Sequence, residues 1–421
     1  MANTKVKILH GNIVYSQSDK QLQEIIDGYI VVENGVIEGV YSNLPEQYQN
    51  VVLEDFGDDV IIPAFSDLHV HAPQYPQRGL AMDKILADWL AQYTFPLEEK
   101  YSDLDFATAV YDAFCDDLIA NGTFHVVIFG TIHSEATGRL IERLEKKGLN
   151  AYVGKVNMDQ NCPDGLKEDV QQSLDETEKF LQKYCNNRTA KPILTPRFAP
   201  TCSGELLCGL GKLAKKYQVG VQTHLVESIW EAQEAKRLFP DCSCDTQIYE
   251  KAGLLGHGPF VGAHFIFPSD DDVEIIKKYN GFAVHCPDAT VNVIAGIMPF
   301  HSLANRGVNV GLGSDIAAGH HLGIYTQVAK AVQLSKIKAF YEKENSSIDF
   351  AKAFYHATKM GGKLFGKVGS IEKGYQCNLI VVKNISDCFE KLTPIQIVQR
   401  FCHVGQPNLI VARFLNGEKI G

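Results

Sequence analysis

The chain has 421 residues, and a folded protein of this length buries roughly three quarters of the surface that its unfolded chain exposes, so a large core is expected. Apolar residues make up 45% and charged residues 21% of the chain, a composition typical of globular proteins and not of disordered ones. The formal net charge of −10 at pH 7, without a block of lysine and arginine, argues against a nucleic-acid partner or an anionic membrane surface.

The sequence predicts a protein of the cytoplasm. The start of the chain lacks a long apolar segment followed by a cleavage site, and no uninterrupted apolar run approaches ~18 residues. The eleven cysteines are odd in number and form no CxxC pair. This usage is typical of reduced thiols and not of a disulfide framework.

Residues 1–62 and 367–421 predict the two parts of one small β-domain, a β-sandwich built from both termini. Each part holds short apolar runs with the character of strands, and turn-forming pairs interrupt or follow these runs. The runs lie at residues 6–15, 29–38, 379–382 and 409–414. The pairs are Gly11-Asn12, Asn34-Gly35 and Asn416-Gly417.

Residues 63–366 predict the main domain, a (β/α)8 barrel of the TIM type, which makes the fold class α/β. Eight short, β-branched apolar runs occur in this part of the chain, and segments of helical periodicity separate most of them. The runs lie at residues 60–65, 124–129, 151–156, 193–198, 220–225, 259–265, 281–286 and 308–313. Eight strands that alternate with helices are the pattern of this barrel.

Polar side chains of the kind found in catalytic sites stand at the carboxyl ends of six of these runs. In chain order they are His69 with His71, then Arg197, His224, His264, His285 and Asp315. The carboxyl ends of all strands of a closed barrel lie on one face, where barrel enzymes have their active sites. We therefore expect these side chains to lie close together.

The pair His69 and His71 indicates a metal site. Side chains alternate along a strand, so two histidines separated by one residue point the same way and can bind one ion. Alone, the pair also fits two ordinary histidines at a solvated strand end, so further ligands are required. His224 would supply a third imidazole and Asp315 a carboxylate. Such a set holds Zn²⁺ or Fe²⁺ and leaves a position for water, whose pKa the ion lowers towards ~7.

Catalytic roles are predicted for Glu227 and His264, next to this set, and for Asp315 within it. Glu227 lies three residues after His224, where its carboxyl group would reach a substrate and protonate a ring nitrogen. The alternative is a glutamate that only caps the start of a helix. Asp315 can accept the proton of the water. His264 is expected to orient the water, with a role as a metal ligand as the alternative.

The order of these motifs resembles the metal-dependent amidohydrolase superfamily and its mononuclear deaminases: HxH, HxxE, a lone histidine, then Ser-Asp after a glycine-containing strand. Within the superfamily the chain is similar to the barrel-type guanine deaminases. The segments that carry this similarity are HAPQY at 71–75, DWLAQYTFP at 88–96, VGKV at 153–156, TPRF at 195–198 and HLVE at 224–227.

The resemblance implies the hydrolytic deamination of guanine to xanthine and ammonia, with one Zn²⁺ per chain (Fe²⁺ being possible) and a homodimeric assembly. The implied metal ligands are His69, His71, His224 and Asp315. The implied catalytic residues are Glu227, His264 and Asp315, and the implied substrate-binding residues are Gln74, Arg197, Phe198 and Glu227. Guanine presents O6 and the acceptor N3, so Arg197 would donate to O6 and Glu227 would protonate N3. Contact of the base with Trp89, Tyr93 or Phe95 stays open.

Other functions remain as alternatives. A mononuclear amidohydrolase that acts on cytosine, an adenosine-like compound or a triazine would share the metal ligands, but the Gln74 and Arg197 pair favours a purine with O6. A binuclear hydrolase needs a lysine at the end of the fourth barrel strand, where Arg197 stands. Zinc deaminases of the open-sheet type need P-C-x-x-C, which this sequence does not contain. A non-catalytic scaffold would be expected to lose ligands, and all four are present.

Overall fold

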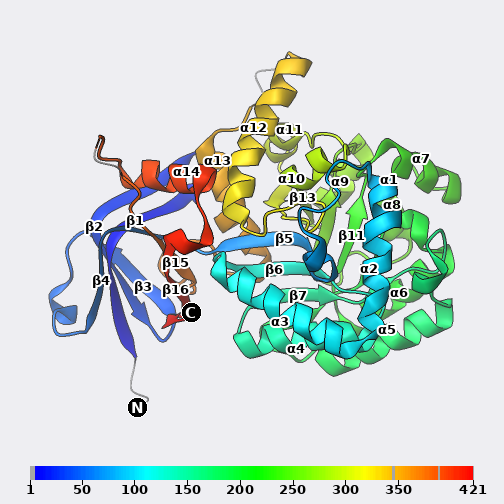
Figure 1. Ribbon diagram of the computed structural model, residues 1–421, viewed down its shortest axis with the longest axis horizontal. Coiled ribbons are helices and arrows are strands. Elements are labelled where there is room, and N and C mark those ends of the chain that lie inside the picture. Colours follow the sequence, from blue (N-terminus) through cyan, green and yellow to red (C-terminus); the bar gives the residue numbers. More distant parts are fainter. Residues whose placement is uncertain (1–4, 344–346, 387–388, 421) are drawn as a thin grey trace.

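The computed structural model describes residues 5–343, 347–386 and 389–420. These residues form a barrel and, beside it, a sheet made from both ends of the chain (Figure 1). Within the described residues, no helix is long and apolar enough to cross a membrane. All cysteines in the same ranges are free.

The barrel consists of two four-stranded parallel sheets. The first contains β5 (Phe65–His71), β6 (Thr123–Phe129), β7 (Asn150–Gly154) and β9 (Ala190–Pro192). The second contains β11 (Val221–Leu225), β12 (Phe260–His264), β13 (Phe282–His285) and β14 (Asn309–Leu312). The short strands β8 (Val156–Asn157) and β10 (Thr195–Pro196) pair beyond β7 and β9.

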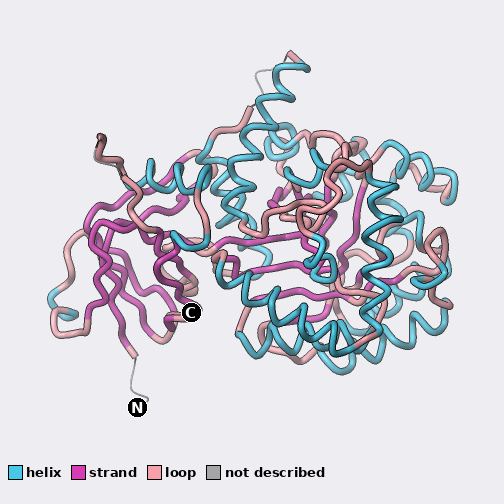
Figure 2. Tube along the Cα trace, in the orientation of Figure 1, coloured by secondary structure: helices cyan, strands magenta, loops and turns pink. Residues whose placement is uncertain are grey.

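Backbone contacts join the two sheets on both sides. A bridge between Leu194 and Val221 connects the first sheet to β11. On the other side, the N–H of Asp315 donates to the carbonyl of His69 at 2.8 Å, and the N–H of His71 donates to the carbonyl of Ile316 at 3.1 Å. The strands therefore close into a ring with helices outside it (Figure 2), which confirms the predicted (β/α)8 barrel of the α/β class.

Helices connect successive strands and cover the outside of the barrel. They are α3 (Leu104–Ala120), α4 (Ser134–Lys147), α5 (Val170–Tyr184), α6 (Gly204–Tyr217), α7 (Ile229–Leu238), α8 (Asp245–Lys251), α9 (Asp270–Lys278), α10 (Pro287–Asn292), α11 (Phe300–Asn305), α12 (Ile324–Glu342) and α13 (Phe350–Tyr355). Local signals set their ends: Ser269 and Asp272 form a capping box at the start of α9, and Gly148 ends α4 at a φ of 73°.

The predicted position of the first barrel strand, residues 60–65, was wrong. Residues 60–63 belong to β4 (Leu53–Pro63), which pairs with β1 and β15 in the small sheet. The first barrel strand is β5, and Ala64 between the two strands donates its N–H to the carbonyl of Asn378. Because every residue from 60 to 71 is buried, hydropathy gives no sign of the change of sheet. His69 and His71 consequently lie within the barrel strand, at its carboxyl end.

The small sheet has seven strands in the order β17-β16-β15-β4-β1-β2-β3. Their further bounds are β1 (Val6–Ser18), β2 (Gln21–Glu33), β3 (Val36–Tyr41), β15 (Leu379–Val382), β16 (Ile410–Leu415) and β17 (Glu418–Lys419), with α14 (Pro394–Val404) packed beside them. The sheet curls around its own core, because Ile37 of β3 and Phe414 of β16 belong to one buried cluster. This arrangement confirms a small β-domain built from both termini, while its limits at residues 62 and 367 stay a proposal.

Two of the three predicted turn pairs form hairpins. Asn34-Gly35 joins β2 to β3 with φ values of 50° and 82°, and Asn416-Gly417 joins β16 to β17 with φ values of 51° and 77°. The prediction for Gly11-Asn12 was wrong, because both residues lie inside β1, where the pairing with β2 and β4 shifts by a bulge. A pair that favours a hairpin also tolerates a bulge, so local sequence does not separate the two.

Candidate active site

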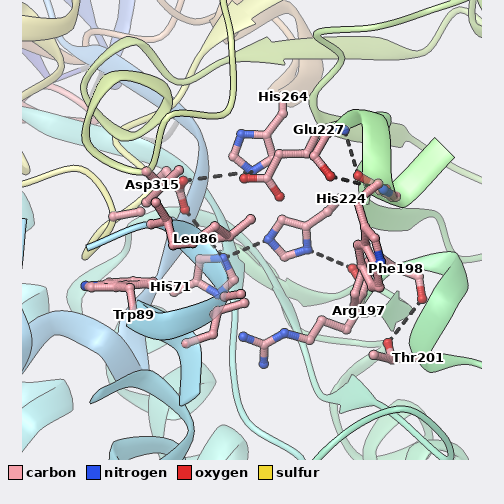
Figure 3. Close-up of a pocket in the computed structure, with 18 of the residues that line it drawn as sticks. His71, Leu86, Trp89, Arg197, Phe198, Thr201, His224, Glu227, His264 and Asp315 are labelled. Atoms are coloured by element: carbon pink, nitrogen blue, oxygen red, sulfur yellow. Dashed lines mark hydrogen bonds and ion pairs between the residues drawn. The ribbon is translucent and has the colours of Figure 1, made fainter. Parts of the chain in front are cut away.

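A cavity of about 570 Å³ opens at the carboxyl ends of the barrel strands (Figure 3). Its inner end is polar and is lined by His71, Gln74, Arg197, His224, Glu227, His264 and Asp315. Its outer half is largely apolar and is lined by Ile85, Leu86, Leu90, Trp230, Val293 and Ile294, among others. The proposed ligand, catalytic and substrate-binding residues border this cavity, except His69, which is 1% exposed and whose Nε2 lies next to Asp315. His285, which was expected near them, is outside the lining set.

Three histidines and one aspartate converge at the inner end. The Nε2 atoms of His71 and His224 lie 3.1 Å apart. Oδ1 of Asp315 lies 3.2 Å from Nε2 of His69 and 3.5 Å from Nε2 of His71. The barrel closure between β5 and the turn after β14 brings His69 and His71 next to Asp315, and His224 joins them from β11.

His264 stands next to this cluster from β12. Its Nε2 lies 3.8 Å from Oδ2 of Asp315 and 3.7 Å from Oε1 of Glu227. Its ring stacks on that of His224 at a centroid distance of 5.4 Å. One ligand atom each from His69, His224 and His264 lies within 4.8 Å of the others. His264 is therefore placed both for a ligand role and for contact with a group held between it and Asp315.

The donor set fits a divalent ion such as Zn²⁺ or Fe²⁺, which binds neutral imidazole nitrogens and carboxylate oxygens. Nε2 of His69 is buried and makes no hydrogen bond within the described residues, although it faces the cluster. Burial, followed by the neighbouring imidazoles, lowers the pKa of His71 and of His224 well below the ordinary value. Both imidazoles are therefore neutral near pH 7 and keep a lone pair for a metal.

Two hydrogen-bonded contacts orient the cluster. Nδ1 of His224 lies 2.7 Å from the carbonyl of Arg197, so Nδ1 carries the proton and the lone pair of Nε2 faces the cluster. Asp67, which is fully buried, accepts hydrogen bonds from the N–H groups of His69 at 3.1 Å and Ser314 at 3.0 Å. Asp67 thus joins β5 to the turn that carries Asp315, a role for which sequence gives no specific signal.

Glu227 lies at the border of the cluster, on the opposite side of His224 from Arg197 (Figure 3). Burial, and then the charge of Asp315, raises the pKa of Glu227 to about 8. Its carboxyl group is therefore mainly protonated at neutral pH and can act as a proton donor. The capping alternative was wrong, because the side chain that accepts from the start of α7 is Ser228, at 3.1 Å from the N–H of Glu231.

Arg197 and Gln74 meet at a third carboxylate, Glu98. Nη1 of Arg197 lies 2.6 Å from Oε2 of Glu98, and Nη2 lies 3.3 Å from Oε1. Nε2 of Gln74 donates to Oε1 of Glu98 at 3.0 Å, while Oε1 of Gln74 accepts from the N–H of Ala317 at 3.1 Å. No sequence pattern indicates a role for Glu98. It lies on α2 (Phe95–Glu99), next to the exposed Glu99, and only the tertiary contact distinguishes the two glutamates.

Aromatic side chains form part of the cavity wall. Phe198 lies beside Arg197, and its ring is 6.4 Å from that of Trp230. Of the three aromatic residues left open by the sequence, Trp89 on α1 (Leu86–Trp89) and Phe95 border the cavity. Tyr93 is outside the lining set and is 38% exposed. The guanidinium of Arg197 lies over the ring of Phe95, 5.2 Å from its centroid.

Comparisons with known proteins place this geometry in a family context. A profile described as "Amidohydrolase family" matches residues 60–407. The guanine deaminase of Dictyostelium discoideum is 31% identical over 446 aligned positions, which cover 100% of this chain and 99% of that protein. The guanine deaminase of Rattus norvegicus is 30% identical and covers 86% of this chain and 83% of its own length. A crystal structure of guanine deaminase from C. acetobutylicum with bound guanine superimposes with a TM-score of 0.96 at 42% identity, covering 99% and 100% of the two chains.

Proposed function

The chain belongs to the amidohydrolase family, and we propose that it is a guanine deaminase, which hydrolyses guanine to xanthine and ammonia. The observation that carries this assignment is the placement of Glu227 and Arg197 on opposite sides of one histidine and aspartate cluster. Glu227 is a proton donor and matches the N3 edge of guanine on one side of C2. Arg197 is a hydrogen-bond donor and matches the edge with O6 on the other side. The similarity to guanine deaminases over nearly the whole chain supports the same substrate.

We assign His69, His71, His224 and Asp315 as ligands of one Zn²⁺ per chain, with Fe²⁺ as the alternative. The neutral imidazoles and the orphaned Nε2 of His69 support this set. A bound ion of this kind lowers the pKa of a coordinated water towards ~7 and so supplies hydroxide at neutral pH. His264 is the residue that orients the attacking water, because its Nε2 lies between Asp315 and Glu227.

The side chains of this chain then account for the proton transfers. Asp315 accepts the proton of the water whose oxygen bonds to C2 of guanine. Glu227 donates its proton to N3, which relieves the charge that develops on the ring. When the bond between C2 and the exocyclic nitrogen breaks, Asp315 returns its proton to that nitrogen, which leaves as ammonia. The hydroxyl group on C2 gives its proton to Glu227, which restores that carboxyl group, and the carbon that carried the amine becomes the second carbonyl of xanthine.

Arg197, Gln74 and Phe198 are assigned to substrate binding. The Arg197 guanidinium keeps N–H donors beyond those that bind Glu98, and we assign one of them to O6. Gln74 uses one N–H and one lone pair on its protein partners and keeps one of each for the N1 edge of the base. The ring of Phe198 is assigned to packing on the flat face of the purine.

We also propose that the enzyme works as a homodimer in the cytoplasm and binds neither nucleic acid nor membranes. The exposed aromatic pair Phe340 and Tyr341, 78% and 77% exposed at the end of α12, supports an interface between copies. The net charge of −10 supports the absence of an anionic partner. Light scattering of the Phe340→Ser variant would test the dimer, with a monomer as the expected result.

Metal removal tests the proposed chemistry. Protein treated with a chelator should lose its ability to release ammonia from guanine, and stoichiometric Zn²⁺ or Fe²⁺ should restore it. Circular dichroism before and after treatment controls for unfolding. Full activity in chelated protein whose metal content has been shown to be negligible would contradict the assignment.

A further inference from the structure

The two halves of the cavity differ in chemistry. The inner end holds the charged and ionisable groups: the histidine cluster, Asp315, Glu227 and the Arg197–Glu98 pair. The outer half presents apolar side chains, and three of them are strongly exposed at its border: Ile85 (53%), Trp230 (57%) and Ile294 (76%). Large apolar side chains gathered at the mouth of a cavity indicate that this region binds by contact area and not by hydrogen bonds.

Four polar side chains that line the cavity make hydrogen bonds within the protein. Nδ2 of Asn161 donates to the carbonyl of Pro200 at 2.7 Å, and Oγ1 of Thr201 donates to the carbonyl of Phe198 at 3.1 Å (Figure 3). Ser228 caps α7. Oε2 of Glu231 accepts from the N–H of Glu227 at 2.7 Å. These four groups therefore have a structural role besides lining the cavity.

The proposed orientation of guanine sends its second ring into this outer half. C2 lies at the metal cluster, N3 faces Glu227 and O6 faces Arg197. The imidazole ring is fused at C4 and C5, on the side of the pyrimidine ring farthest from C2. The second ring therefore points away from the cluster and towards the outer wall around Phe198 and Trp230.

The volume of the cavity leaves room beyond a purine base. Pockets of roughly 300–1,000 Å³ commonly hold drug-sized ligands, and this cavity measures about 570 Å³. A bare purine base is smaller than the ligands that such pockets usually bind. A wider second ring can thus enter the outer half without displacing the pyrimidine ring from the inner end.

We propose that the enzyme makes its specific hydrogen bonds only with the 2-amino-4-oxopyrimidine half of its substrate. It therefore also deaminates pterin, in which a six-membered pyrazine replaces the imidazole ring. This inference rests on the proposed function, because it uses the same site and the same orientation. The 4-oxo group of pterin corresponds to O6 of guanine and its N1 to N3. Water adds its oxygen to C2, the C2–amine bond breaks, and ammonia and 2,4-dioxopteridine form without any change of oxidation state.

The size of the loss in kcat/KM distinguishes two kinds of outer half: one that hydrogen-bonds the second ring and one that only leaves space for it. A change of size in an apolar pocket costs roughly 10–200-fold in kcat/KM, whereas the loss of a hydrogen bond that a site is built to make costs roughly 10⁴–10⁵-fold. A site that ignores the nitrogens of the second ring should therefore accept pterin, and also 7-deazaguanine, in which a CH group replaces N7.

The experiment compares kcat/KM for guanine, pterin and 7-deazaguanine with the metal-loaded enzyme, by ammonia release. We expect both analogues to fall within about 10³-fold of guanine. A larger loss for either analogue, with guanine turned over, would overturn the inference and leave the proposed function intact. Failure on guanine itself would instead contradict the proposed function and, with it, this inference.

Two controls sharpen the test. 2,4-Diaminopteridine carries an amino group where Arg197 needs an acceptor, so its turnover should fall below that of pterin by about 10⁴-fold; equal turnover would overturn the inference. Trp230→Ala should lower kcat/KM for pterin several-fold more than Ile229→Ala. Ile229 is the neighbouring exposed residue (59%) outside the cavity lining. Equal effects of the two substitutions would show that the outer wall does not contact the second ring. That result would also overturn the inference.

Discussion

Glu98 and Arg197 form a buried two-point ion pair across the inner end of the cavity, with N–O distances of 2.6 and 3.3 Å and side chains that are 3% and 5% exposed. Such a fork-to-fork pair fixes the plane of the guanidinium and the directions of its remaining N–H donors. Because Gln74 donates to the same carboxylate, one residue orients both side chains that we assign to the O6 and N1 edge of guanine.

Replacement of Glu98 should therefore reduce selectivity as well as stability. Glu98→Gln leaves Arg197 buried and without a counter-charge, and the loss of one partner of such a pair costs about 3–5 kcal/mol. We expect a lower melting temperature and a compressed kcat/KM ratio between guanine and 2-aminopurine, which lacks O6. The matched control is Glu168→Gln, since Glu168 pairs with the buried Lys155 away from the cavity. An unchanged substrate ratio in Glu98→Gln would reduce Glu98 to a structural residue.

Arg197→Met should remove the preference of the enzyme for guanine over 2-aminopurine. If Arg197 donates to O6, then 2-aminopurine leaves a desolvated guanidinium without its acceptor, and guanine should be preferred by as much as ~10⁴–10⁵-fold. The variant should lose activity on guanine and bring the two substrates closer together. Steady-state kinetics on both bases measures this, and a variant that kept the wild-type ratio would remove Arg197 from the O6 role.

Glu227→Gln should keep the fold and the metal but lose roughly 10²-fold or more in kcat, because the amide can hydrogen-bond N3 without supplying a proton. A near-normal kcat would exclude the general-acid role.

The pH profile offers a second test of Glu227. Its pKa is raised to about 8, so the proton needed for catalysis is present below that pH and is lost above it. Activity should fall as the pH rises through about 8, and the Gln variant should lack this limb. The same shift lowers stability as the pH rises. The unfolded carboxyl group ionises near pH 4.5, whereas the folded one keeps its proton up to about pH 8, so Glu227 destabilises the fold increasingly between these two pH values. Denaturant titrations at pH 5 and pH 8 would show whether Glu227→Gln is less pH-dependent than the wild type.

His69→Ala tests the metal site. Elemental analysis should find one Zn²⁺ or Fe²⁺ per wild-type chain and a strongly reduced content in the variant. Asp315→Asn should reduce metal content and rate together, because the side chain is proposed as both ligand and base. Two metals per chain, or full retention after His69→Ala, would contradict the mononuclear assignment.

The sequence carried enough information for the barrel and for most of the site. Alternation along a strand placed His69 and His71 on one side, and barrel closure placed Asp315 beside them, so three separate segments could be combined without a structure. The first strand was misplaced because residues 60–71 are uniformly apolar or buried, and a change of sheet within such a run leaves no periodic signal.

Glu98 and Asp67 are site residues that could not be predicted from the sequence. Both carboxylates are buried, with 2% and 0% of their surfaces exposed, and both act by holding other residues of the site. Their importance comes from contacts with residues far away in the chain. Neither has a spacing or a neighbour in sequence that separates it from an exposed acid such as Glu99.

The most direct test of the central claim is a competition assay. Metal-loaded enzyme is given guanine, adenine, cytosine and 2-aminopurine at equal concentrations, and the remaining bases, xanthine and ammonia are followed over time by chromatography and an ammonia assay. The account predicts that guanine disappears first, by orders of magnitude in rate, and that xanthine and ammonia form in equal amounts. Faster consumption of adenine or cytosine, or no consumption of guanine, would contradict it.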